Sequence, residues 1–211
     1  MRRFSFRDQF CIQANHALST IFTVSDNPRK NPADSIAEEN LTRDEIKNSL
    51  GCMRVNHTGE VCAQALYRGQ LLSSRSKKTK AMLEKSCDEE TDHLAWTKKR
   101  IEELNGKTSI LNLFFYNNAF FIGVLAGLCG DRWSLGFVEE TEIQVAKHLE
   151  SHLEKISEKD QKSRAIIAQM REEEIQHEQA AVTAGAAQLP WIIKKCMRLH
   201  AKMMTVTAYY C

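Results

Sequence analysis

Two Glu-x-x-His motifs, each preceded about 30 residues upstream by another glutamate, constrain the fold of this chain more than any other feature. A three-residue step turns a helix through about 300°, so the Glu and His of each motif lie on one helical face. The order Glu, then Glu-x-x-His, occurring twice, predicts two helical hairpins whose four helices direct these side chains inward. The six residues are Glu60, Glu90 and His93 in the first half of the chain and Glu142, Glu174 and His177 in the second.

Helical phase selects these glutamates from their acidic neighbours. Either motif alone is weak evidence, because a chain of 211 residues with 7 histidines contains about 0.6 such pairs by chance. Glu142, and not Glu140, takes the missing place in an apolar stripe with three- and four-residue spacing. Glu174, and not Glu172 or Glu173, does the same in the following helix. The stripes comprise Leu135, Val138, Val145 and Leu149, then Ile167, Met170, Ala181 and Ala184.

Four carboxylates in core positions require compensating charge. An ionised carboxylate buried without a partner is far more costly than the roughly 1 to 3 kcal/mol of an unmade neutral hydrogen bond. Two histidines cannot neutralise four carboxylates, whereas two divalent cations can, with the imidazoles as neutral ligands. Bundles that bind two irons use this ligand set, and oxygen-rich ligation suits iron or manganese better than structural zinc. The alternative is a helical bundle with scattered buried salt bridges.

The rest of the chain predicts an all-α fold. With only 9 glycines and 3 prolines, it lacks the turn residues of a many-stranded protein. Residues 1–37 are interpreted as an N-terminal amphipathic helix and a linker, and residues 38–211 as the helical domain. The predicted helices cover residues 42–72, where Thr42 and Glu45 form a capping box, then 78–105, 132–157 and 159–187, with a last helix opened by Pro190.

The uncharged segment 108–130 is long enough to cross a bilayer, but asparagines and glycines interrupt it. We therefore expect a buried or interfacial helix there. The C-terminal helix mixes apolar and basic residues, which suits an anionic membrane surface, although a solvated basic helix packed on the bundle fits as well. The net charge of +2 does not indicate a nucleic-acid partner, and seven cysteines without a Cys-x-x-Cys favour a reducing compartment.

The chain resembles the demethoxyubiquinone hydroxylase family of ubiquinone biosynthesis. The resemblance lies in RVNHTGE at 54–60, ALYRGQ at 65–70, EETDHL at 89–94 and EEEIQH at 172–177. It implies a ferritin-like four-helix bundle with additional apolar and amphipathic helices, and two iron ions on the six residues that helical phase selects. It also implies a site-lining His148. Tyr67, two helical turns after Glu60, is a candidate for a redox role or for a hydrogen-bonded core tyrosine.

The activity implied by the resemblance is that of a di-iron monooxygenase. It would hydroxylate the ring of a demethoxyubiquinol, a prenylated quinol, with O2 and with reducing equivalents that we expect NADH to supply. The alternative is a ferritin-like iron-oxidising or peroxide-scavenging protein with no organic product. A nucleic-acid-modifying enzyme is disfavoured, because the basic run at 75–80 falls at a predicted turn and has no interleaved aromatic residues.

The partners and the location follow from the same resemblance. We expect peripheral association with a membrane and a lipid-presenting protein partner, and no nucleic acid. The expected location is the cytoplasmic face of a bacterial inner membrane. The arginines near the N-terminus leave open the matrix side of the mitochondrial inner membrane, since a presequence is a weaker alternative to an ordinary amphipathic helix.

Overall fold

The computed structural model describes residues 5–22 and 29–211, and this part of the chain contains helices and no strand. The expected all-α fold is therefore confirmed. Residues 1–4, with Arg2 and Arg3, and 23–28, part of the predicted linker, lie outside the described residues, as does the side chain of Phe6. The helices are α1 (Phe6–Phe22), α2 (Arg43–Ser73), α3 (Lys77–Glu103), α4 (Asn112–Leu128), α5 (Asp131–Lys155), α6 (Gln161–Ala184) and α7 (Trp191–Tyr210).

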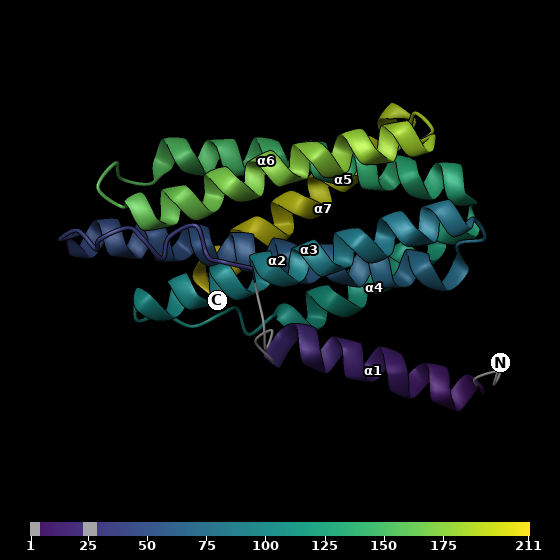
Figure 1. Cartoon of the computed structure of the whole chain (residues 1–211), viewed down its shortest axis with the longest axis horizontal. Coiled ribbons are helices and arrows are strands. Elements are labelled where there is room, and N and C mark those ends of the chain that lie inside the picture. The colour runs from purple at the N-terminus through teal and green to yellow at the C-terminus, as the bar shows by residue number, and fades with distance from the viewer. Residues whose placement is uncertain (1–4, 23–28) are drawn as a thin grey trace.

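Four long helices form the central bundle (Figure 1). α2 and α3 make one hairpin, α5 and α6 make the other, and the hairpins meet through α3 against α6 and α2 against α5. α4 connects the hairpins and packs along the outside of α2. This is the ferritin-like four-helix bundle with additional helices, and its interior is the space between the two hairpins.

Local capping explains where the helices begin and end. The Thr42 hydroxyl accepts a hydrogen bond from the Glu45 amide, and the Glu45 carboxylate accepts one from the Thr42 amide at 2.8 Å, as the capping box predicts. α6 begins later than expected, because Asp160 caps it by accepting from the Ser163 amide at 3.0 Å. It ends earlier because Gly185, with a φ of 104°, adopts the left-handed conformation that terminates helices.

α4 is half-buried. Phe115, Tyr116 and Ala119 face the interior, whereas Phe114 and Phe121 on the opposite side are exposed. Among the described residues, no helix has both the length and the apolar character needed to cross a membrane. The close contact of α4 with α2 depends on two glycines: a Cβ on Gly69 would meet the Phe120 carbonyl, and one on Gly123 would meet the Leu66 carbonyl.

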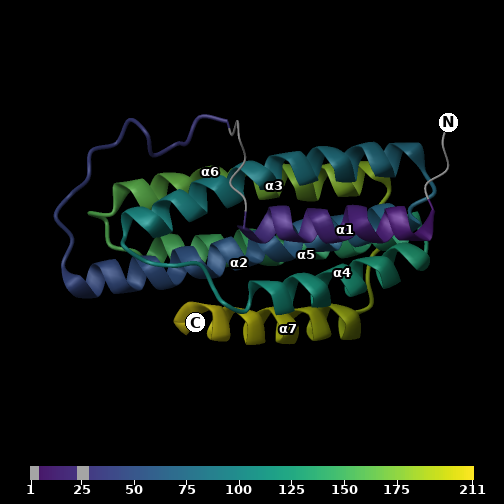
Figure 2. The same ribbon diagram turned by 90° about the horizontal axis from the view of Figure 1, so that it is seen from below.

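The N-terminal segments lie against the bundle. α1 packs on α2 and α4 (Figure 2), but the face predicted to be apolar is only partly covered, since Ile21 is buried while Phe10 and Leu18 are exposed. Part of the predicted linker is also packed. Ala33 belongs to the hydrophobic core, and its backbone amide donates a hydrogen bond to the Asn31 side chain at 2.8 Å. Residues 29–41, which we call the strap, thus run over the bundle before α2 begins.

Gly69 and Gly59, both on α2, provide a matched test of the α2–α4 contact. Gly69→Ala should lower the free energy of unfolding by about 1 to 3 kcal/mol, because the new methyl group overpacks a backbone contact. Gly59→Ala should instead raise it by up to about 1 kcal/mol, because open space surrounds that position and alanine favours the helix. Chemical denaturation of both variants measures the difference. Equal stabilities would contradict the close approach of the helices.

Candidate metal centre

The six side chains selected by helical phase meet in the middle of the bundle. Two groups of four have ligand atoms within 4.8 Å of one another, and the groups share Glu90 and Glu174. All six side chains are buried. The group that contains His93 is Glu60, Glu90, His93 and Glu174, which we call the His93 quartet; the His177 quartet is Glu90, Glu142, Glu174 and His177.

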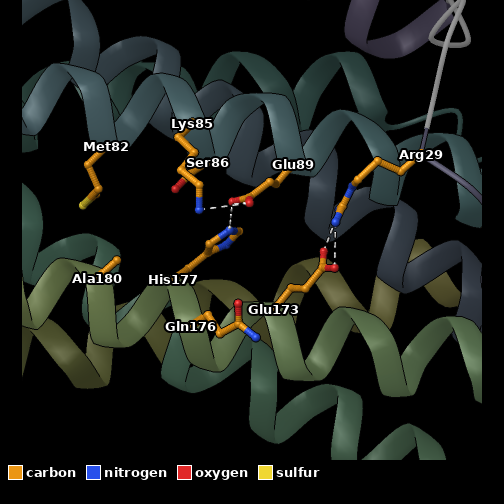
Figure 3. A pocket seen from close by; sticks show the side chains of 9 residues that line it. All are labelled: Arg29, Met82, Lys85, Ser86, Glu89, Glu173, Gln176, His177 and Ala180. Carbon is orange, nitrogen blue, oxygen red and sulfur yellow. Dashed lines mark hydrogen bonds and ion pairs between the residues drawn. The ribbon is translucent and has the colours of Figure 1, made fainter.

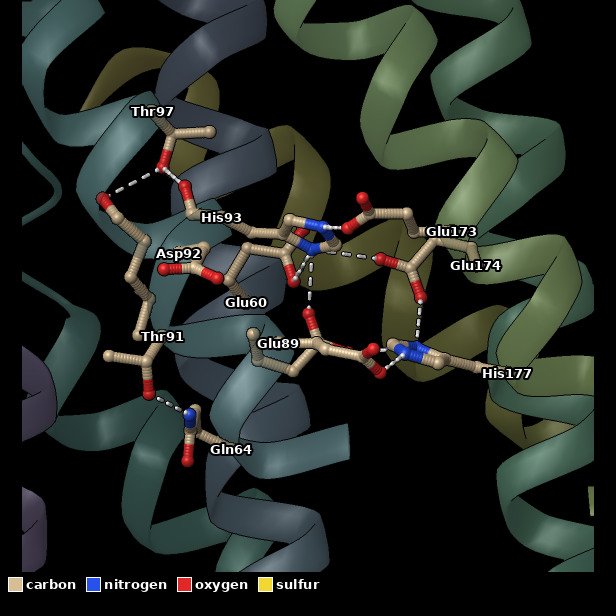
Figure 4. A network of polar contacts seen from close by, with 12 residues as sticks. Glu60, Gln64, Glu89, Thr91, Asp92, His93, Thr97, Glu173, Glu174 and His177 are labelled. Carbon is tan, nitrogen blue, oxygen red and sulfur yellow. Dashed lines mark hydrogen bonds and ion pairs between the residues drawn. The ribbon is translucent and has the colours of Figure 1, made fainter. Parts of the chain in front are cut away.

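Each helix of the bundle contributes to the cluster. Figure 4 labels four of its six side chains: Glu60, His93, Glu174 and His177. α2 supplies Glu60 and α5 supplies Glu142, while α3 and α6 each supply a Glu-x-x-His pair. Most apolar residues of the α5 and α6 stripes are buried as well, Leu135 and Met170 among them, while Val145 and Ala184 are partly buried. The same packing that buries the stripes therefore brings the carboxylates together.

Both imidazoles direct Nδ1 into the cluster. His93 Nδ1 lies 2.8 Å from Glu90 Oε2 and 3.3 Å from Glu174 Oε1. His177 Nδ1 lies 3.2 Å from Glu90 Oε1 and 3.3 Å from Glu174 Oε2. The two shared carboxylates thus stand between the two histidines, as ligands that bridge two metal ions would.

The outer nitrogen of each histidine pairs with a glutamate of the opposite motif. His93 Nε2 lies 2.8 Å from Glu173 Oε2, and His177 Nε2 lies 2.8 Å from Glu89 Oε2. These carboxylates favour the tautomer with the proton on Nε2, which leaves Nδ1 free for a metal. Glu89 and Glu173 were not predicted from the sequence. The signal was present, because both motifs read Glu-Glu-x-x-His.

The charges of the cluster depend on one another. Burial and the neighbouring Glu90 carboxylate raise the pKa of Glu60 well above its usual value, and burial with Glu174 does the same for Glu142. Burial alone would raise the pKa of Glu90, but its histidine neighbours lower it. Burial alone would lower the pKa of both histidines, but the neighbouring carboxylates outweigh burial. They raise the pKa of His93 well above its usual value and the pKa of His177 to about 12. Protons therefore balance the carboxylates when metal ions do not.

The donor set fits a pair of metal ions. Within the described part of the chain, Glu142 Oε2 is a buried oxygen without a partner, and Glu90 Oε1 and Glu174 Oε1 accept no well-aligned hydrogen bond, although each lies 3.2 to 3.3 Å from a histidine Nδ1. Such oxygens are costly unless a cation binds them. Two divalent ions would balance the four carboxylates and use these oxygens, so the buried cluster is compatible with a metal site.

The other candidate residues lie at different distances from the cluster. The Tyr67 hydroxyl donates to Glu142 Oε1, so this tyrosine contacts a candidate ligand directly. His148 is in neither quartet; its ring packs on that of His152 with centroids 4.1 Å apart. Glu140 faces away from the cluster, as expected, and pairs with Lys194 of α7 at 2.9 Å.

Two cavities lie beside the centre. A cavity of about 430 Å³ lies between α2, α4, α5 and α7, and the residues that line it are mostly apolar. Its lining residues Gly59 and Ala63 flank Glu60, and Thr141 precedes Glu142. On the other side, a polar pocket of about 100 Å³ opens between α3 and α6 (Figure 3), lined by Arg29, Met82, Lys85, Ser86, Glu89, Glu173, Gln176, His177 and Ala180.

Known proteins are similar in sequence to this chain over nearly its whole length. The family model described as ubiquinone biosynthesis protein COQ7 matches residues 47–208. A 3-demethoxyubiquinol 3-hydroxylase of Coxiella burnetii (strain Dugway 5J108-111) is 50% identical over 209 residues, which cover 99% of this chain and 97% of that relative. The protein of the same name from Chromobacterium violaceum is 46% identical over 202 residues, covering 96% of this chain and 98% of the relative.

Alanine substitutions on α5 test the assignment of ligands. Glu142→Ala should lose bound metal, because it removes a carboxylate of the His177 quartet. Glu140→Ala should keep the metal of the wild type, since its carboxylate faces α7. Metal analysis of the purified variants gives the ratio of metal to protein. The reverse result would show that the helical phase is misassigned.

Metal uptake should release protons. His93 and His177 have raised pKa values, as do Glu60 and Glu142, so the metal-free cluster holds protons that incoming ions displace. The apparent affinity for Co²⁺ should therefore rise between pH about 6 and about 8. Calorimetric titration in two buffers with different ionisation enthalpies counts the released protons. Identical binding enthalpies in both buffers would contradict this exchange.

Proposed function

The chain belongs to the COQ7 family of ubiquinone biosynthesis proteins, and from this we propose that it is a 3-demethoxyubiquinol 3-hydroxylase. The observation that carries the proposal is the buried cluster of four glutamates and two histidines in a chain that shares about half its residues with named hydroxylases. The reaction uses O2 and a prenylated quinol. The peroxide-scavenging alternative is not favoured, because the relatives are named for a quinol substrate.

The proposed cofactor is a pair of iron ions held by Glu60, Glu90, His93, Glu142, Glu174 and His177. Iron supplies the dioxygen chemistry that protein side chains cannot perform. The chain's own groups prepare the site: Glu89 and Glu173 hold the ring protons on Nε2, and Tyr67 donates a hydrogen bond to Glu142. The packed stripes keep bulk water from the carboxylates, which strengthens their attraction for cations.

The apolar cavity is the proposed substrate site. Its lining includes Gly59 and Ala63, which lie just before and one helical turn after Glu60, and Thr141, which precedes Glu142, so a ring seated at its inner end would lie beside the metal centre. Its wall includes Leu66, Phe137 and several α7 residues, which suit a prenyl tail because they exclude water without requiring hydrogen bonds. The few polar lining groups, Thr141, Gln144 and His200, are available to a quinol hydroxyl.

We further propose peripheral membrane association at the cytoplasmic face of a bacterial inner membrane. The apolar residues exposed on α4 and α7 support this proposal, Phe121 and Leu125 on the first and Trp191, Leu199 and Met203 on the second. These helices also line the cavity, so a quinol could pass from the lipid into it. We also propose that a lipid-presenting protein binds the same surface and that NADH supplies the electrons.

Product formation tests the proposed function. Iron-loaded protein supplied with a demethoxyubiquinol analogue, a reductant and O2 should yield the hydroxylated ring, detected by mass spectrometry. Ala201→Phe, which fills the cavity from α7, should lower product formation at least about tenfold while the bound iron is unchanged.

The control is Val206→Phe, which adds an aromatic ring on the exposed side of the same helix and should keep the activity. Iron-loaded wild-type protein that consumes peroxide but forms no hydroxylated product would contradict the proposal. Equal product from Ala201→Phe and the wild type would show that the cavity is not the substrate site.

A further inference from the structure

We propose that Arg29, a strap residue outside the four-helix bundle, is a positioning residue for His93 and makes the His93 quartet the tighter of the two metal sites. The inference rests on the proposed metal centre and concerns what distinguishes its two halves. The Glu-Glu-x-x-His repeat makes the ligands of the two halves alike, so a difference in affinity comes from the groups around them: Arg29 and Glu173 beside His93, and Tyr67, which donates to Glu142, in the other half.

Arg29 holds Glu173 with both ends of its guanidinium group. Nη1 donates to Glu173 Oε1 at 2.9 Å, and Nη2 donates to Glu173 Oε2 at 2.7 Å (Figure 3). Gln169 donates to Glu173 Oε1 at 2.7 Å, so this carboxylate has little freedom to rotate. Glu173 Oε2 also pairs with His93 Nε2, which places Arg29 one carboxylate away from a metal ligand.

Arg29 is itself held by α3. Its backbone amide donates to Asp92 Oδ1 at 2.9 Å, and its Nε donates to Asp92 Oδ2. Its carbonyl oxygen accepts from the Trp96 indole at 3.1 Å, and its guanidinium carbon lies 5.1 Å from the centre of that ring. The Trp96 and His93 rings are 5.5 Å apart. The arginine therefore joins α3 to α6 around His93.

Among the described residues, the other half of the centre has no such arrangement. Glu89, which pairs with His177, is held by Lys85 of its own helix at 3.1 Å, and the Lys85 side chain is 74% exposed, against 46% for that of Arg29. A solvated lysine contributes little to holding a carboxylate, whereas a bidentate arginine fixes both oxygens. Glu173 is also better shielded, with 10% of its side chain exposed against 26% for Glu89.

A rigid Glu173 should strengthen metal binding by His93. The carboxylate keeps the ring proton on Nε2 and the ring in the orientation that points Nδ1 at Glu90 and Glu174, so a metal ion meets a prepared ligand. Without Arg29 the carboxylate can turn toward solvent, and the histidine must be ordered when the metal binds. Losing such an outer partner costs about 10- to 100-fold in metal affinity.

Titration of the metal-free full chain with Co²⁺ under anaerobic conditions tests the inference. The wild type should bind in two resolved steps. Arg29→Gln should weaken the tighter step about 10- to 100-fold, so that the steps merge, and Arg29→Lys should give a smaller loss. Lys85→Gln should change either affinity less than about threefold. Asp34→Ala controls for strap attachment, because it removes the 2.6 Å pair with Lys99, which does not reach the centre.

Proton NMR of the Co²⁺-loaded protein provides a readout that strap attachment alone would not change. Each histidine should give one exchangeable Nε2 proton shifted by the metal. Arg29→Gln should speed exchange with water for the His93 proton and leave the His177 proton unchanged. If Arg29→Gln does not fold, Glu173→Gln serves instead, since its amide oxygen can still accept from His93 but cannot form the ion pair.

The outcomes separate the two proposals. A folded wild-type protein that binds no Co²⁺ would overturn the metal centre and this inference with it. Two-step binding that Arg29→Gln leaves unchanged would overturn the inference and leave the metal centre standing. Equal losses in Arg29→Gln and Asp34→Ala would likewise overturn it, because the strap would then act only as a tether.

Discussion

The burial of four carboxylates in the interior of one helical bundle is the constraint on which the rest of this structure depends. Glu60, Glu90, Glu142 and Glu174 lie where a bundle normally places hydrophobic residues, and each is almost inaccessible to water. Charge compensation has to come from within the protein. Without metal, protons on the two histidines and on some of the carboxylates compensate the negative charge. Two divalent ions would compensate the charge of all four carboxylates and would also bind the oxygens that accept no hydrogen bond.

The layers around the cluster follow from this constraint. Each histidine that faces the carboxylates with Nδ1 turns Nε2 outward, where it needs an acceptor, and the first Glu of the opposite motif supplies one. On the α3–α6 side this outer shell borders a small polar pocket. On the side of α2 and α5 the cluster borders an apolar cavity that α4 and α7 complete. The centre thus borders a small pocket lined mostly by polar residues on one side and an apolar cavity on the other, and the apolar cavity suits a lipid-soluble quinol.

Much of the fold and the inner site could be predicted from the sequence, because both depend on helical periodicity. The spacing of Leu135, Val138 and Leu149 identifies the phase of α5 and so distinguishes Glu142 from Glu140. The ends of α6 were less predictable, because Asp160 and Gly185 act through local backbone geometry. The role of the strap had no periodic signal: Arg29 lies in a stretch rich in turn residues, and its partners Asp92 and Glu173 are 63 and 144 residues away in the chain. Long-range pairing of this kind depends on the assembled bundle.

Two cations complete the native bundle if the four buried carboxylates are metal ligands, and an anaerobic thermal melt of the metal-free protein with increasing Fe²⁺ measures this. Ions that bind the folded chain and not the unfolded one stabilise it by about 1.4 kcal/mol for each tenfold excess over the dissociation constant. We expect the melting temperature to climb steeply up to two equivalents of Fe²⁺ and only gradually beyond. A melting temperature that does not respond to Fe²⁺ would show that the carboxylates are not ligands of a metal pair.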